Sequence, residues 1–252
     1  MKDTKWMYEK PAAHRGFHDN KVAPENSLLA IKKAVDAGYN IEFDVHMTKS
    51  KVLVVHHDFS IKRTTGLDMD ITDIDTNNLE QYKLFGTNEH IPTFDDVLNT
   101  VDGKVNLIVE IKPIRRGQNL KEVVDAILDR LSKYNGVYCL ESFDLRVVDY
   151  LHKNYPDKVL GQLYEGDFAP QRWLCFACNQ HKKVDFLAIC IKNANLKKYA
   201  KIRKKYPEKV FVTWTVRTLE QQQTALKLCD SYIFETNTKN DSYIAPPPLS
   251  LK

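Results

Sequence analysis

The sequence of 252 residues lacks any long apolar segment. No run of 18 apolar residues occurs, so no membrane-spanning helix is predicted. The N-terminal segment MKDTKWMYEK also lacks the apolar stretch of a secretory signal peptide. Cysteine is scarce, with five residues, and this odd number favours reduced thiols over a disulfide framework. We therefore expect an intracellular, cytoplasmic protein.

A large excess of charge of one sign is also absent. The 37 basic and 33 acidic residues leave a net charge of +4. A nucleic-acid-binding domain would usually carry a strongly basic stripe, so no nucleic-acid partner is expected. Hydrophobic residues make up 43% and charged residues 28%, which excludes a disordered chain or a collagen-like repeat.

Strand-like and helix-like segments alternate along the whole chain. Strands are predicted at 11–17, 40–46 with a continuation at 51–57, 105–112, 137–143, 159–164, 184–190, 210–216 and 231–236. Helices are predicted at 24–38, 119–134, 144–155, 170–182, 194–206 and 218–229. This order predicts parallel strands joined by crossover helices. The glycine-rich phosphate loop that an open sheet would usually carry after its first strand is missing.

About eight such units in about 250 residues favour a (β/α)8 barrel, the TIM-barrel fold. We predict a single domain over residues 1–252. The segment at about 59–92 breaks the spacing and is predicted to be a small polar insertion after the second strand. The end of the chain, APPPLSLK, is predicted to be extended. No oligomeric state is predicted from the sequence.

Acidic side chains alternate with apolar ones in two of the predicted strands. Because strand side chains alternate between two faces, Glu42 and Asp44 should point into the barrel, as should Glu110 and Lys112. Three buried carboxylates need compensating charge. A divalent cation bound by oxygen ligands, Mg²⁺ or Ca²⁺, would supply it. The alternative is a salt-bridge cluster with Lys112 and Arg15 and no metal.

Two histidines stand at the ends of predicted strands. His14 ends the first, and His57 follows the apolar run at 52–55. Active sites of this fold lie at the C-terminal ends of the strands, and imidazole suits proton transfer near neutral pH. Each histidine alone could be structural, and His56 is interpreted in that way. Together with the three carboxylates, His14 and His57 indicate a catalytic site.

A series of short motifs carries a resemblance to a known family. The motifs are His14-Arg15-Gly16, Pro24-Glu25-Asn26-Ser27, Glu42-x-Asp44, Val55-His56-His57-Asp58, Arg63-Thr64-Thr65, Ile91-Pro92-Thr93, Glu110-Ile111-Lys112, Ser142-Phe143 and Trp214-Thr215-Val216. Through their order and spacing, over residues 11 to about 237, the sequence resembles the glycerophosphodiester phosphodiesterases. The resemblance implies a (β/α)8 barrel with an insertion after the second strand.

The resemblance also implies a reaction and the residues for it. The enzyme would be a phosphoric diester hydrolase that converts a small glycerophosphodiester to sn-glycerol 3-phosphate and an alcohol. The implied roles are Glu42, Asp44 and Glu110 for one divalent metal, His14 and His57 for acid–base catalysis, Arg15 and Lys112 for the phosphate, and Trp214 for the glycerol side. Either histidine can be the base and the other the acid, and we favour His14 as the base and His57 as the acid.

The sequence departs from the family pattern near its end. Arg217 stands where an asparagine often follows the Trp-Thr-Val motif. The last predicted strand ends in Phe234-Glu235-Thr236 rather than in a Thr-Asp pair followed by proline. These departures concern the last strands and leave the five candidate metal and acid–base residues in place.

Two alternative functions remain open at the level of sequence. A lysophospholipase D would share the chemistry but would need an apolar groove for an acyl chain. A catalytically silent barrel that binds phosphate compounds would be expected to lack a histidine or a carboxylate of the set. The lysine-rich segment 192–209 is interpreted as a solvated helix face, with weak association with anionic lipid as the alternative.

Overall fold

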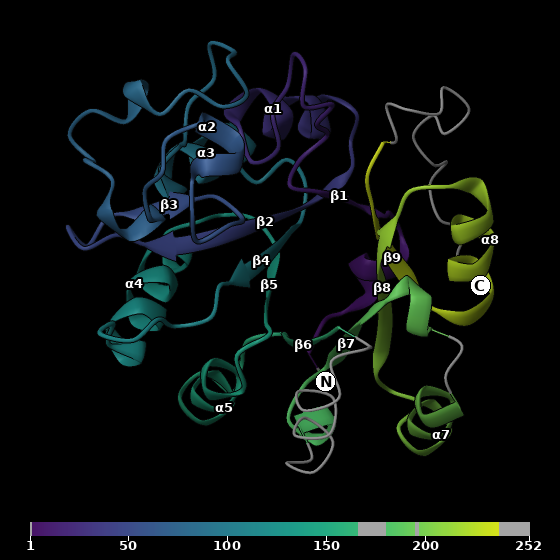
Figure 1. Ribbon diagram of the computed structural model, residues 1–252. Helices are drawn as coiled ribbons and strands as arrows, with labels where there is room; N and C mark the ends of the chain where they lie inside the picture. The colour runs from purple at the N-terminus through teal and green to yellow at the C-terminus, as the bar shows by residue number, and fades with distance from the viewer. Residues whose placement is uncertain (1, 166–179, 195–196, 237–252) are drawn as a thin grey trace. The chain divides into compact units, whose positions relative to one another are not determined.

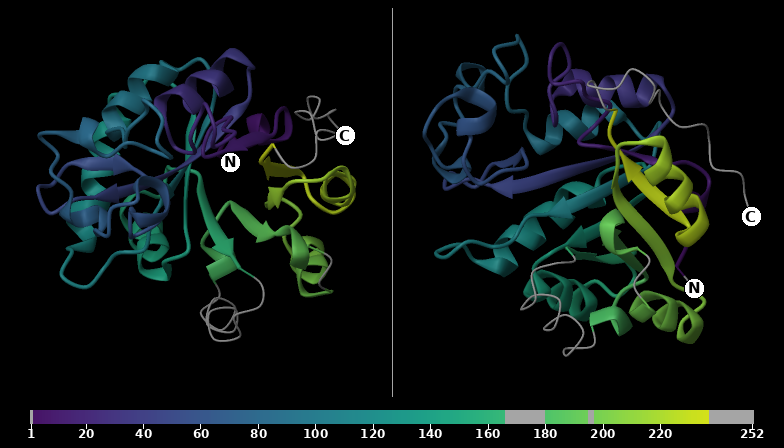
Figure 2. Two further views of the ribbon diagram at one scale, coloured as in Figure 1. Left: turned by 45° about the horizontal axis from the view of Figure 1, so that its top comes forward. Right: turned by 45° about the vertical axis from the view of Figure 1, so that its right-hand side comes forward.

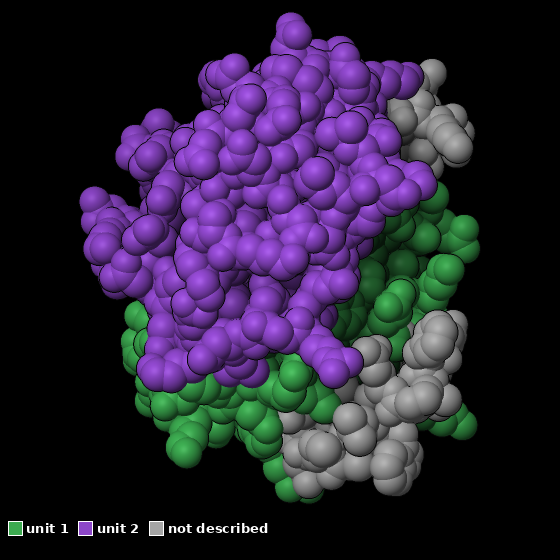
Figure 3. All heavy atoms as spheres, turned by 60° about the vertical axis from the view of Figure 1, so that its left-hand side comes forward, with its two compact units in different colours: residues 1–12, 139–252 green, residues 13–138 purple. Residues whose placement is uncertain are grey.

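The computed structural model describes residues 2–165, 180–194 and 197–236 (Figure 1). Most of the helix predicted at 170–182 and the extended end of the chain lie outside the described residues. The chain forms two compact units, residues 13–138 and residues 1–12 with 139–252 (Figure 3). The single domain stays a prediction.

The unit of residues 13–138 is built on the long strand β2 (Asn40–Met47). The short strand β1 (Ala12–His14) pairs with β2, and β4 (Leu107–Ile111) lies parallel to it, with Asp44 beside Glu110. The strand β3 (Leu53–Val55) is antiparallel to β2, whereas the sequence predicted a continuation. The chain reverses because Lys51 adopts a positive φ of 66° and its N–H donates to the Thr48 carbonyl, closing a tight turn.

Helices of this unit begin at side chains that cap their free N–H groups. The helix α1 (Leu28–Asp36) begins after Ser27, whose hydroxyl accepts from the Ala30 N–H, so it starts later than predicted. A capping box of Thr93 and Asp96 starts α3 (Phe94–Val101), which was not predicted and lies beside α1 (Figure 1). The longer α4 (Leu120–Ser132) follows β4.

The segment predicted as a polar insertion contains an apolar cluster of its own. It includes the helix α2 (Lys62–Thr65) and the turns η2 (Ile71–Asp73) and η3 (Leu79–Gln81). Its buried members, together with one residue of β3, are Val54, Ile61, Ile71, Ile74, Tyr82, Leu84 and Ile91. Burial of these side chains anchors the insertion against β3.

The second unit is a run of parallel strands. In order of pairing these are β5 (Tyr138–Ser142), β6 (Leu160–Tyr164), β7 (Phe186–Cys190), β8 (Val210–Val216) and β9 (Ser231–Phe234). The helices among its described residues are α5 (Leu145–Asn154), α7 (Lys197–Lys205) and α8 (Leu219–Leu228), and α8 packs against β8 and β9 (Figure 2). Short turns of helix occur at η1 (Lys5–Tyr8), η4 (Gln180–Lys182) and η5 (Ile191–Asn193).

Within the described parts of the chain, no helix combines the length and the apolar character needed to cross a bilayer. The described thiols of Cys139, Cys190 and Cys229 are free.

Candidate active site

Three carboxylates meet on the neighbouring strands β2 and β4. One oxygen from each of Glu42, Asp44 and Glu110 lies within 4.8 Å of the other two. The parallel register places Asp44 beside Glu110, and the two-residue repeat of the strand puts Glu42 on the same face. On the opposite face, Phe43 packs its ring against Phe94 of α3. The structure thus brings together the carboxylates whose alternation with apolar residues predicted a shared face.

Two cations and an amide reach this cluster. The Lys112 ammonium lies 3.1 Å from Asp44 Oδ1 and 2.9 Å from Glu110 Oε1. The Arg15 Nε lies 3.6 Å from Asp44 Oδ2, and the backbone N–H of Arg15 donates to Glu42 Oε2. The Asn26 amide also donates to Asp44 Oδ2 at 2.9 Å. The salt bridges of the alternative reading are therefore present, but two cations face three carboxylates.

Burial and the neighbouring charges shift the pKa values of two of these carboxyl groups in opposite directions. Burial raises the pKa of Asp44, but the charges of Lys112, His57 and Arg15 outweigh it and hold that pKa well below its usual range. For Glu110, burial and the neighbouring Asp44 outweigh Lys112 and raise the pKa to about 7. The cluster therefore has room for a further positive charge near neutral pH.

A hard divalent cation fits this donor set. All three donors are carboxylate oxygens, the ligands that Mg²⁺ and Ca²⁺ prefer. Glu42, Asp44 and Glu110 are the residues that could hold it.

Both candidate histidines lie near the carboxylates. The His14 Nε2 is 3.7 Å from Glu42 Oε2, and the charges of both imidazoles contribute to the low pKa of Asp44. The Nδ1 of His57 lies 2.6 Å from Asp58 Oδ1. Bonds from Arg63 and His57 lower the pKa of Asp58 to about 2 in spite of its partial burial, so this carboxylate is the acceptor and His57 Nδ1 donates. Burial lowers the pKa of His57.

The neighbouring His56 is occupied elsewhere. Its ring nitrogens lie 2.9 Å from the Thr64 hydroxyl and 2.8 Å from the Asp58 carbonyl, and it is buried. These contacts agree with the structural role assigned to it from the sequence.

Local backbone geometry explains the His14-Arg15-Gly16 motif. Arg15 and Gly16 have positive φ angles of 54° and 80°. A Cβ at Gly16 would lie 2.8 Å from the Ala30 carbonyl carbon, so only glycine allows the loop to pass α1 so closely. The turn after β1 directs the Arg15 side chain to Asp44 and to Glu25, whose Oε1 accepts from Arg15 Nη1 at 2.7 Å.

Four side chains around the site received no role from the sequence. Glu25, Asn26, Asp58 and Arg63 appear there only as members of the short motifs. Their motif positions were the available signal, but no periodic pattern ties loop residues to particular strand residues.

The remaining candidate, Trp214, belongs to the other unit. Its indole N–H donates to the Ala188 carbonyl at 3.2 Å, and its ring meets Phe143 edge-to-face. Its place beside the glycerol stays a prediction. The two departures from the family pattern contact each other, because Arg217 forms an ion pair with Glu235 at 2.6 Å.

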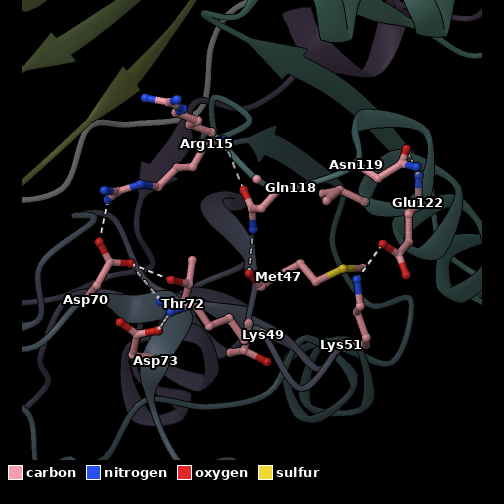
Figure 4. Close-up of a pocket in the computed structure, with 14 residues that line it drawn as sticks. Met47, Lys49, Lys51, Asp70, Thr72, Asp73, Arg115, Gln118, Asn119 and Glu122 are labelled. Atoms are coloured by element: carbon pink, nitrogen blue, oxygen red, sulfur yellow. Dashed lines mark hydrogen bonds and ion pairs between the residues drawn. The ribbon is translucent and has the colours of Figure 1, made fainter.

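A cavity of about 340 Å³ lies elsewhere in the unit of residues 13–138 (Figure 4). It is lined by the β2–β3 turn, the insertion near Asp70 and the loop before α4. Charges pair around it, as in the contacts of Arg115 with Asp70 and of Lys51 with Glu122. None of the three clustered carboxylates lines it, so it is separate from the candidate active site.

Comparison with known proteins identifies the family. The sequence model of the glycerophosphoryl diester phosphodiesterase family matches residues 14–232. The chain belongs to this family. Among its relatives, YhdW of Bacillus subtilis is 33% identical over 152 residues, which cover 57% of this chain and 61% of YhdW. The lysophospholipase D GDPD1 of Rattus norvegicus is 30% identical over 122 residues, 40% of this chain and 38% of the relative. The matches thus span less than two thirds of these relatives.

Similarity to solved structures confirms the predicted (β/α)8 barrel. A phosphodiesterase from Oleispira antarctica, solved in complex with the product sn-glycerol-3-phosphate, matches with a TM-score of 0.75 and 20% identity. The match covers 90% of this chain and 92% of the other.

Lys112 lies between the buried carboxylates of Asp44 and Glu110 and should therefore contribute to the stability of this family member. When divalent ions are absent from the buffer, Lys112→Met should lower the free energy of unfolding by about 3 kcal/mol. The reason is that Asp44 and Glu110 would stay buried without the lysine ammonium that now pairs with them. Denaturant unfolding followed by circular dichroism measures the change. Lys121→Met, which breaks an exposed pair with Asp125, should cost less than about 0.5 kcal/mol. Equal losses in the two variants would contradict the prediction.

Proposed function

We propose that this chain is a phosphodiesterase that hydrolyses small glycerophosphodiesters to sn-glycerol 3-phosphate and an alcohol. The observation that carries the proposal is the buried trio of Glu42, Asp44 and Glu110 in a member of this family. The imidazoles of His14 and His57 near Asp44 support it. The sn-glycerol-3-phosphate bound to the Oleispira antarctica enzyme agrees with such a product.

The negative charge of the substrate is the first obstacle to this reaction. A phosphodiester anion repels a nucleophile, and further charge develops on its oxygens in the transition state. In the proposal, Arg15 and Lys112 contact these oxygens and stabilise that charge. A divalent ion held by Glu42, Asp44 and Glu110 would supply Lewis-acid polarisation of a phosphoryl oxygen when bound.

The two histidines are proposed to carry the proton transfers. His14 takes the proton from the nucleophile, which is water or the 2-hydroxyl of the substrate's own glycerol. Attack by the 2-hydroxyl gives a cyclic phosphate, which water then opens to sn-glycerol 3-phosphate. His57 donates a proton to the oxygen of the leaving alcohol. Because Asp58 accepts from Nδ1 of His57, the Nε2 is the nitrogen left to exchange this proton. Trp214 is proposed to cover the glycerol side.

The alternative activity is that of a lysophospholipase D. The sequence similarity to the Rattus norvegicus lysophospholipase D supports this alternative. It would use the same side chains on a substrate that carries an acyl chain. A catalytically silent barrel is disfavoured because all three carboxylates and both histidines are present.

A substrate panel tests the proposed activity. We expect release of sn-glycerol 3-phosphate from at least one of glycerophosphocholine, glycerophosphoethanolamine, glycerophosphoglycerol and glycerophosphoinositol. Lysophosphatidylcholine assayed in parallel, with choline release as the readout, tests the alternative. No release from any diester would refute the proposal.

Excess chelator in the same assay tests the metal. Release should stop in the chelator and return with Mg²⁺ or Ca²⁺, because the proposed charge stabilisation includes the ion. Undiminished release after exhaustive chelation would remove the metal from the proposal.

Substitution of the histidines tests whether each of them takes part in proton transfer. His14→Ala and His57→Ala should each lower kcat by roughly 10²-fold or more, the scale of general acid–base catalysis. His152→Ala, on the exposed side of α5, is the matched control and should keep the wild-type kcat. A wild-type kcat in either site variant would rule out that residue's role.

Weak association with anionic lipid through α7 is a separate part of the proposal. Tyr199 and Ile202 of this helix are buried, while Lys197, Lys201 and Lys204 are exposed. Sedimentation with phosphatidylserine vesicles should show binding that weakens with salt and with Lys201→Glu/Lys204→Glu. Salt-independent sedimentation, or none, would exclude the association.

A further inference from the structure

The side chain of Arg63 bridges two carboxylates that belong to different segments. From α2 its Nε donates to Asp58 Oδ2 at 2.5 Å. Its Nη1 and Nη2 donate to the two oxygens of Glu25 at 2.9 and 2.6 Å. A guanidinium suits this task because its five N–H donors lie in one plane and can serve two carboxylates at once.

Each of these carboxylates continues to a residue of the proposed reaction. The second oxygen of Asp58 accepts from Nδ1 of His57 at 2.6 Å. The Oε1 of Glu25 also accepts from Nη1 of Arg15 at 2.7 Å. One continuous path of charge-assisted hydrogen bonds therefore joins the imidazole of His57 to the guanidinium of Arg15. The path runs His57–Asp58–Arg63–Glu25–Arg15.

Burial of Glu25 makes its end of the path more rigid than an exposed ion pair would be. Glu25 is only 5% exposed, and burial alone would raise its pKa. The bonds from Arg63 and Arg15 outweigh burial and lower that pKa to about 2, so Glu25 is ionised at neutral pH. Bidentate charge-assisted bonds fix both direction and distance, which surface pairs seldom do.

Resting on the proposed function, we propose that Arg63 is a positioning residue for the reaction. Through Asp58 it fixes the orientation of His57, and through Glu25 it fixes Arg15. One side chain that touches no reacting atom thus aligns the proton-transfer group with the phosphate-contacting group. Reaction rates depend strongly on such alignment.

Three variants separate the two arms of the path. Asp58→Asn weakens the arm to His57 and should lower kcat with little change in KM. Glu25→Gln weakens the arm to Arg15 and should mainly raise KM. Arg63→Ala breaks both arms and should lower kcat/KM roughly 10- to 100-fold, the usual loss when a supporting residue is removed. Initial rates of sn-glycerol 3-phosphate release measure all three.

A double variant tests whether the arms act through Arg63. Because Arg63 acts on His57 through Asp58, Arg63→Ala should reduce kcat less in the Asp58→Asn background than in the wild type. Arg63→Lys keeps the charge but not the planar fork, so it should restore only part of the lost kcat/KM.

The neighbouring Lys62 provides a matched control. It stands on the same helix and pairs with Asp68 at 2.9 Å, outside the path. Lys62→Ala removes one positive charge and should leave kcat and KM unchanged. Losses equal to those of Arg63→Ala would mean that net charge, and not the path, is responsible.

An NMR measurement on the full chain tests the path without turnover. The imidazole ¹⁵N signals of wild-type His57 should report a proton on Nδ1, and Arg63→Ala should weaken that preference. This readout separates failure of the path from failure of the proposed reaction, in which no diester would be cleaved. Thermal unfolding checks that each variant is folded. If Arg63→Ala does not fold, Arg63→Lys is compared with the wild type in its place. A folded variant with wild-type kcat, KM and tautomer would overturn the proposal.

Discussion

Burial of negative charge on one face of β2 and β4 is the constraint on which the site depends. Carboxylates away from water are costly unless positive charge and hydrogen-bond donors surround them. Lys112, the Arg15 loop and the Asn26 amide all contact Asp44 or its neighbours. The same constraint explains why Gly16 follows Arg15, since the loop must pass closely over α1 to bring this guanidinium back to the strand.

Incomplete compensation gives the site its chemical character. Two cations facing three carboxylates leave the pKa of Glu110 raised to about 7 while that of Asp44 stays low. Such a site could hold a further cation, and the two strands fix the positions of its donor oxygens. Preorganised charge of this kind is what phosphodiester chemistry requires, because the barrier there is mainly electrostatic.

Periodicity was the most informative signal in the sequence, and its reach is local. It predicted that Glu42, Asp44 and Glu110 share a face, because the two-residue repeat of a strand holds wherever the strand is embedded. It missed the reversal at Lys51, because a single positive φ leaves little periodic trace. We also did not predict the short helix α3, although its buried residues Phe94, Val97, Leu98 and Val101 follow helical spacing. The late start of α1 at Ser27 is a similar case, in which a capping side chain decided the boundary.

The sequence by itself determined the alternation of strands and helices, the family motifs and the acidic face of two strands, since each rests on short-range spacing. Only the tertiary structure decided which charges meet. Arg63 and Glu25 are separated by 38 positions and lie outside any shared repeat, yet their side chains form a bidentate pair. Contacts of this kind join segments that lie far apart in the sequence, so the pairing depends on packing and not on spacing along the chain.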